Sequence, residues 1–113
     1  MEEAESYIVK HREQLDGDVY QLLLPLAKRM EKQGRVLAAT LLFRALLNSI
    51  FKRALSKYYS YGVRYLRKLD ELAGNVQNWG EVPAHAAYLE EIREKHLRKH
   101  SFWTRYEAAQ KQG

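Results

Sequence analysis

The residues with the most evident chemical potential lie in one basic stretch near the end of the 113-residue chain. Between residues 93 and 106, cationic side chains alternate with the aromatic rings of Phe102, Trp103 and Tyr106. Cations neutralise phosphates and rings stack on unpaired bases, so this combination is typical of proteins that bind RNA or single-stranded DNA. The alternative interpretation, which we favour, is a solvated last helix whose Phe102 and Trp103 close the core. The candidate contacts for a nucleic acid or a protein partner are Arg93, Lys95, Arg98, Lys99, His100 and Arg105.

Three histidines in this half of the chain are candidate ligands or bases. His96 and His100 lie four residues apart on an expected helix, a spacing at which two imidazoles can reach one metal ion. No third ligand is nominated, and the neighbouring lysines and arginine would repel a cation, so we predict neither a metal nor another cofactor. His85 and His96 fall on an apolar stripe, where a buried imidazole commonly bonds to a tyrosine hydroxyl or a backbone carbonyl. We therefore expect packing roles for both.

The sequence contains no pattern typical of a catalytic site. It has no cysteine, so thiolate nucleophiles and disulfides are excluded. It also lacks a phosphate-binding glycine loop, a Gly-x-Ser-x-Gly elbow and paired carboxylates at an expected cleft. We therefore predict that the protein is not an enzyme and has no catalytic residues.

A group of tyrosines suggests a different kind of site. Tyr58, Tyr59, Tyr61 and Tyr65 lie close together in the sequence. Tyrosine supplies a large contact area at little entropic cost, so these side chains could rim a groove for a peptide. The alternative, which we favour, is that they are half-buried packing residues of a helix.

Helices must position these residues, because apolar side chains recur at spacings of three and four through nearly the whole chain. No segment alternates apolar and polar residues over a useful length, so we expect no strands. Asp18 is the predicted N-cap of the second helix, and Gly34 ends it. Pro25 predicts either a kink within this helix, which we favour, or a helix start near Leu24. The expected helices cover residues 2–15, 18–33, 35–57, 58–73 and 83–99, with a last turn or short helix holding residues 102–106.

The helix at 35–57 is the most apolar segment and should lie at the centre of the fold. Apolar residues cover most of its sides and leave only Arg44, Asn48 and Lys52 as a polar ridge. Very short turns join it to the helices before and after, which favours antiparallel helical hairpins. The predicted fold is therefore all-α, a tetratricopeptide-like repeat bundle of four to five helices.

Four blocks of the sequence, in this order, carry a resemblance to a known family. They are Leu23–Leu47 (LLPLAKRMEKQGRVLAATLLFRALL), Tyr61–Ala73 (YGVRYLRKLDELA), Asn78-Trp79 and His85–Trp103 (HAAYLEEIREKHLRKHSFW). Together they resemble the C-terminal part of an uncharacterised bacterial family, a domain of unknown function with tetratricopeptide-like helical repeats. Within the first block, Gly34–Leu47 resembles the second helix of such a repeat, where small residues nest between helices. The resemblance implies a helical repeat module without an assigned active site or ligand.

The length and the charge of the chain limit its organisation and its location. We expect one helical domain over residues 1–113, which by the resemblance can also be the C-terminal fragment of a longer helical-repeat protein. The net charge of +5 arises in the second half, because residues 1–51 hold seven Lys/Arg and seven Asp/Glu, whereas residues 52–113 hold twelve and seven. The N-terminus is acidic and no apolar run approaches ~20 residues, so we expect a cytoplasmic protein that does not enter a membrane.

These observations favour contact with other molecules over chemistry. We expect a protein–protein interaction or scaffolding module, whose candidate partners include a second copy of the chain and the remainder of a longer protein. The alternative function is a nucleic-acid-binding module that uses the basic, aromatic-rich segment 93–106.

Overall fold

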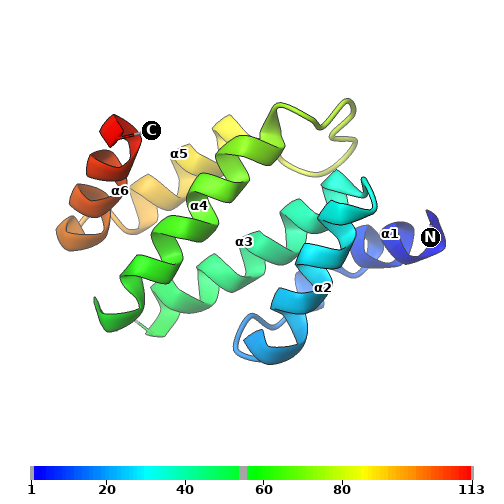
Figure 1. The fold of residues 1–113 in the computed structure, drawn as a ribbon, viewed down its shortest axis with the longest axis horizontal. Helices are drawn as coiled ribbons and strands as arrows, with labels where there is room; N and C mark the ends of the chain where they lie inside the picture. The colour runs from blue at the N-terminus through cyan, green and yellow to red at the C-terminus, as the bar shows by residue number, and fades with distance from the viewer. Residues whose placement is uncertain (1, 54–55, 113) are drawn as a thin grey trace.

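The described residues of the protein form helices, turns and loops only (Figure 1). The structure, a computed structural model, describes the backbone of residues 2–53 and 56–112 and the side chains of residues 5–53 and 56–111. No strand occurs in these ranges, so the all-α prediction is confirmed. The α-helices are α1 (Glu2–Lys10), α2 (Tyr20–Lys32), α3 (Val36–Arg53), α4 (Tyr59–Ala73), α5 (His85–Lys95) and α6 (His100–Gln112), and the short 3-10 helices are η1 (Arg12–Gln14) and η2 (Ser56–Tyr58).

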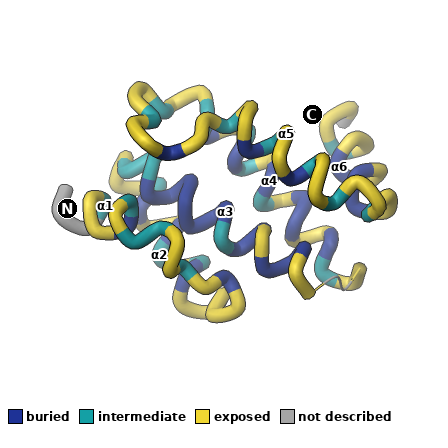
Figure 2. Tube along the Cα trace, turned by 180° about the vertical axis from the view of Figure 1, so that it is seen from behind, coloured by how far each residue is buried: buried dark blue, intermediate teal, exposed yellow. Residues whose placement is uncertain are grey.

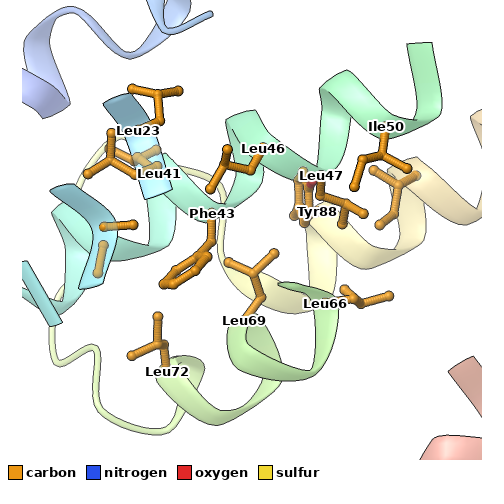
Figure 3. Close-up of a cluster of buried hydrophobic side chains, with 14 of the residues drawn as sticks. Leu23, Leu41, Phe43, Leu46, Leu47, Ile50, Leu66, Leu69, Leu72 and Tyr88 are labelled. Carbon is orange, nitrogen blue, oxygen red and sulfur yellow. The ribbon is translucent and has the colours of Figure 1, made fainter. Parts of the chain in front are cut away.

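Helix α3 lies at the centre of the molecule, as its composition predicts (Figure 2). Helices α1, α2 and α4 all pack against it. The close-up in Figure 3 shows Phe43 of α3 pointing toward Leu69 and Leu72 of α4. Fully burying a side chain of this size contributes roughly 1.5–3 kcal/mol, so the contacts of α3 hold the other helices in place.

The turn between α2 and α3 forms where the glycine predicts it. Gly34 has a φ of 77°, in the left-handed region that glycine enters without a steric penalty. The N–H of Arg35 donates to the carbonyl of Met30 over 2.8 Å, and the N–H of Gly34 donates to that of Glu31 over 3.0 Å. These two bonds make a Schellman motif, which satisfies the last carbonyls of α2 and lets α3 begin two residues later.

The start of α2 differs from the prediction. The helix begins at Tyr20 and runs through Pro25, which excludes a start near Leu24, and its N-cap position is held by Val19. Asp18 is therefore not the N-cap. Its carboxylate instead accepts a hydrogen bond from Ser49 Oγ and lies 3.5 Å from Arg53 Nε. The Asp18 carboxylate thus contacts side chains of α3 and does not accept from the backbone N–H groups of α2. These contacts connect the segment before α2 to α3.

Helices α1 and α3 are shorter than predicted. The expected helix at 2–15 ends at Lys10 and is followed by η1, and the expected helix at 35–57 ends at Arg53. Residues 54 and 55, which the second prediction includes, lie outside the described residues. No helix in the described ranges, α3 included, is both long and apolar enough to cross a membrane.

The described residues contain six α-helices, one more than the expected four to five, because a full helix stands where we expected a last turn or short helix at 102–106. Helix α5 stops at Lys95 where we expected it to reach Lys99, and α6 is a full helix of 13 residues. A tight turn separates them, because the N–H of Lys99 and the indole Nε1 of Trp103 both donate to the carbonyl of His96, over 3.0 and 2.9 Å. This turn lets α6 fold back against α4.

Candidate functional site

The basic residues predicted as partner contacts are divided among three segments. Arg93 is partly engaged within the molecule, since its guanidinium carbon lies 4.7 Å from the Trp103 ring centroid and Nη1 lies 4.0 Å from Glu107 Oε1. Lys95 Nζ lies 2.9 Å from Glu91 Oε1. The six basic residues predicted as partner contacts therefore differ in how far they are engaged within the molecule. Arg93 and Lys95 lie on α5, Arg98 and Lys99 in the turn after it, and His100 and Arg105 on α6.

The aromatic residues of this segment face the core. Phe102 is fully buried, and Trp103 and Tyr106 are almost so. Phe102 packs edge-on against Phe51 of α3 and Tyr59 of α4, with centroid distances of 4.7 and 5.6 Å. These rings are not exposed for stacking on bases. The favoured interpretation, rings that close the core, is confirmed for Phe102 and Trp103.

His96 packs, although not through the hydrogen bond we expected. Its ring stacks on Phe51 with a centroid distance of 4.2 Å and an interplanar angle of 14°. Burial and then the positive charges of Lys99 and Lys95 lower its pKa, which favours the neutral ring. Among the described residues, no three His, Asp or Glu side chains gather in a way that could hold a metal ion, and His96 and His100 belong to no such group.

His85 belongs to a polar cluster that joins three helices. Its Nε2 lies 2.5 Å from Oδ1 of Asp70 on α4. The other carboxylate oxygen, Oδ2, accepts bonds from the hydroxyl of Tyr106 over 2.6 Å and from Nε2 of Gln110 over 3.1 Å. Burial alone would raise the pKa of Asp70, but these hydrogen bonds, led by the one from His85, outweigh it and lower the pKa. Our expectation of a tyrosine or backbone partner for His85 was wrong, because a carboxylate lies within reach.

This cluster predicts a pH-dependent contribution to stability. Since the folded state holds the pKa of Asp70 below the value of about 3.9 for an unfolded chain, the contribution is present above that value and is lost as the pH falls through the lower, folded-state pKa. Asp70→Asn should cost about 2 kcal/mol at pH 7, because several bonds to a charged acceptor are weakened. Urea unfolding of both proteins at pH 7, 5 and 3 measures this. The difference should shrink toward pH 3; a difference that is constant with pH would contradict the assignment.

The feature best suited to hold a partner is a groove over α3, between α2 and α4. It has a volume of about 220 Å³. Tyr20 and Tyr61 are each 50% exposed, while Tyr59 is buried and does not line the groove. Three of the four predicted tyrosines therefore do line a groove, and Tyr20 of α2 joins them. We call this site the tyrosine groove; its main lining residues are Tyr20, Leu24, Ile50, Tyr58, Tyr61 and Tyr65.

Basic side chains lie beside the tyrosines of the tyrosine groove. Lys57 Nζ lies 5.2 Å from the ring centroid of Tyr58, and the guanidinium carbon of Arg64 lies 5.8 Å from that of Tyr61. Arg53, which lines the groove, is also exposed. Burial raises the pKa of Tyr65, so its phenol stays neutral at physiological pH. The groove thus combines aromatic walls with cations close to them.

Comparison with known proteins relates this chain to a family. A model described as "Family of unknown function (DUF6880)" matches residues 1–105. The chain belongs to this family. The prediction of an uncharacterised domain family is therefore confirmed. The family match also covers residues 1–22, which precede the blocks that carried the resemblance. A search of curated proteins and a search of solved structures each found no match.

Sequence reasoning missed two features of this DUF6880 chain. Tyr20 was not placed among the groove tyrosines, because it lies 38 positions before Tyr58 in the sequence. The two residues line one groove only because α2 and α4 both pack against α3. The pairing of Asp70 with His85 crosses the loop between α4 and α5. A carboxylate near the end of one helix and a histidine at the start of the next is a signal that the sequence does contain.

Proposed function

We propose that this chain is a protein–protein interaction module that binds a peptide segment of its partner in the tyrosine groove. The observation that carries the proposal is the pair of half-exposed tyrosines, Tyr20 and Tyr61, on opposite sides of the groove. Tyrosine is enriched among the residues that dominate binding energy in protein interfaces. Peptides often bind such surfaces through one or two apolar anchors placed in a concave site.

The charges at the groove favour one chemistry for the peptide. Arg53 lines the groove and pairs with Asp18, and the cationic groups of Lys57 and Arg64 lie over the rings of Tyr58 and Tyr61. The nearby carboxylate of Asp18 is engaged by Ser49 and Arg53. A partner with an aromatic or large aliphatic anchor between aspartates and glutamates would complement this surface, and opposite charges also speed association at low salt. We therefore propose an acidic, anchor-containing segment as the occupant.

Tyr61→Ala should weaken the binding of such a segment by about tenfold or more, since removing a central interface tyrosine commonly costs above 1 kcal/mol. The probe is a fluorescein-labelled pool of 15-residue peptides, each with one Phe, Trp or Leu among Asp, Glu, Ser and Gly. Fluorescence polarisation measures the affinity. Because the Tyr61 side chain is half exposed, the variant should keep the helical content of the natural protein.

Tyr7→Ala is the matched control, because Tyr7 is also an exposed tyrosine, at 65%, but lies on α1 and does not line the groove. It should bind the acidic pool as the natural protein does. A pool with Lys and Arg in place of Asp and Glu should bind weakly or not at all. Equal binding of the two pools, or equal losses in the two tyrosine variants, would contradict the proposal.

The nucleic-acid alternative receives less support from the residues of segment 93–106. Its aromatic members are buried, which leaves cations alone for contact. Binding through cations alone is sequence-independent and falls steeply with salt. A labelled oligouridine of 15 nucleotides tests it in the same assay. Binding that survives 150 mM salt and is abolished by changing Arg98, Lys99 and Arg105 to Ala would favour the alternative over the peptide groove.

A further inference from the structure

A second hollow, lined mainly by charged side chains, lies along α4. It has a volume of about 420 Å³, and its lining residues are Arg64, Arg67, Lys68 and Glu71 of α4 and Gln110 of α6. Three of these five side chains are cationic and one is anionic. We call this site the arginine hollow. Its excess of positive charge favours an anion as the occupant.

The two arginines of the hollow are accessible to a ligand. Arg64 and Arg67 are both exposed, and neither forms an ion pair with another described residue. They lie three residues apart on α4, a spacing that makes two side chains neighbours on the helix surface. A guanidinium group donates through a planar fork that matches the oxygens of a phosphate or carboxylate. The pair can therefore hold one oxyanion between them.

The other side chains of the hollow are already engaged. Nζ of Lys68 lies 3.0 Å from Oε2 of Glu31 on α2 and 3.4 Å from Oε2 of Glu71. Glu71, the carboxylate of the lining, is thus paired with a cation of the same lining. The amide NH₂ of Gln110 donates within the polar cluster of Asp70. The charges that remain to attract a ligand are those of the two arginines.

One contact links the arginine hollow to the tyrosine groove. The guanidinium carbon of Arg64, which lines the hollow, lies 5.8 Å from the ring centroid of Tyr61, which lines the groove. Arg67 follows Tyr61 by six positions in α4, which is about 9 Å along the helix axis at a rise of about 1.5 Å per residue. An extended peptide rises about 3.3 Å per residue, so about three residues span this distance.

We propose that the arginine hollow binds a phosphorylated side chain of the peptide whose anchor occupies the tyrosine groove. This second contact rests on the proposed function, because the same peptide provides both the anchor and the phosphate. A phosphoserine carries a charge of about −1.5 to −2 at neutral pH and offers three acceptor oxygens, so one phosphate can engage both arginines. A glutamate supplies one charge and two oxygens and complements two guanidinium groups less well. Recognition of phosphorylated motifs by arginine clusters is a recurrent mode of peptide binding.

A scan of phosphoserine positions tests the proposal. The probes are fluorescein-labelled 15-residue acidic peptides with a central tryptophan anchor and one serine, phosphorylated or not, placed one to seven positions before or after the anchor. Fluorescence polarisation at about 150 mM salt, where distant charges are screened, measures the affinities. Phosphorylation three or four positions from the anchor, on one side of it, should raise the affinity by about tenfold or more. Phosphoserine seven positions away, with the same composition and net charge, should raise it by less than about twofold.

Arg67→Gln should remove most of this gain. The unphosphorylated peptide should still bind within about twofold of its affinity for the natural protein, because Arg67 lines the arginine hollow and not the tyrosine groove. Arg67→Lys keeps the charge but loses the fork, so it should also lose most of the gain. Arg98→Gln removes an exposed arginine of the turn between α5 and α6 and is the matched control, which should keep the whole gain. Circular dichroism should show the natural helical content in all three variants.

Two results would overturn the phosphate contact while leaving the tyrosine groove in place. The first is binding of the unphosphorylated peptides with no gain from phosphorylation at any position of the scan. The second is an equal loss of the gain in Arg67→Gln and Arg98→Gln, which would assign it to general attraction of charge. Failure of both the phosphorylated and the unphosphorylated peptides to bind the natural protein would instead overturn the proposed function, and the phosphate contact with it.

Discussion

Phe102→Ala should lower the free energy of unfolding by about 4 kcal/mol, within the range of 3–5 kcal/mol for removing a buried phenylalanine. Phe102 is fully buried and its ring contacts Phe51 of α3, Tyr59 of α4 and Trp103 of α6, at centroid distances of 4.7, 5.6 and 5.0 Å. It is therefore the side chain through which α6 joins the core. Urea unfolding followed by circular dichroism at 222 nm measures the loss.

The control for this substitution is Leu97→Ala, since Leu97 is a large apolar side chain that is 67% exposed. Its cost should stay below about 0.5 kcal/mol. A second comparison uses Gly62, because a Cβ added there would lie 2.9 Å from Cε2 of Phe102. Gly62→Ala should destabilise the natural protein more than it destabilises Phe102→Ala. A loss below 1 kcal/mol for Phe102→Ala would contradict the burial of this ring.

Gly17→Ala should lower the free energy of unfolding by about 3 kcal/mol, because the added methyl group has no space. Its Cβ would lie 2.0 Å from the carbonyl oxygen of Ala45 and 2.8 Å from Cβ of Ser49. The first of these atoms belongs to the backbone of α3 and cannot rotate away, so the connection from α1 to α2 must move outward. Overpacking of this kind typically costs 1–3 kcal/mol and occasionally more.

Gly74→Ala is the matched control for Gly17→Ala. Gly74 has a φ of −68°, and the atom nearest to an added Cβ is a carbonyl oxygen 3.8 Å away, an ordinary contact. This variant should be as stable as the natural protein or more stable by up to about 1 kcal/mol, because alanine restricts the unfolded chain. Thermal unfolding of both variants tests the pair. Equal effects of the two substitutions would show that α3 does not approach Gly17 so closely.

The elements that the sequence predicts well are those with strong local signals. Gly34 ends α2, α3 is central, and the spacing of apolar residues identifies α2, α3 and α4, whereas only a last turn or short helix was expected where α6 forms. The less successful predictions concern residues whose partners lie elsewhere in the chain. Asp18 has the right residue type for an N-cap, but Ser49 and Arg53 bind it. Local pattern cannot decide between a backbone donor and a distant side chain, since both satisfy the same carboxylate.

The candidate sites show the same division. Tyr58, Tyr61 and Tyr65 could be selected from the sequence because they are close together, and they do line a groove. The ridge with Arg44 was also visible from helical spacing. That the guanidinium of Arg44 lies against the rings of Trp79 and Tyr88 depends on how two other segments of the chain pack beside α3. The spacing of apolar residues does not predict such contacts between distant segments.

The most direct test of the proposed function is to map a bound peptide on the protein. An acidic peptide selected from the labelled pool is titrated into the ¹⁵N-labelled chain, and backbone amide shifts are followed. The proposal predicts saturable shifts at Tyr20, Leu24 and Tyr61, with those of Arg98 and Arg105 unchanged. Shifts confined to segment 93–106, or none that saturate, would contradict the assignment of the tyrosine groove as the binding site.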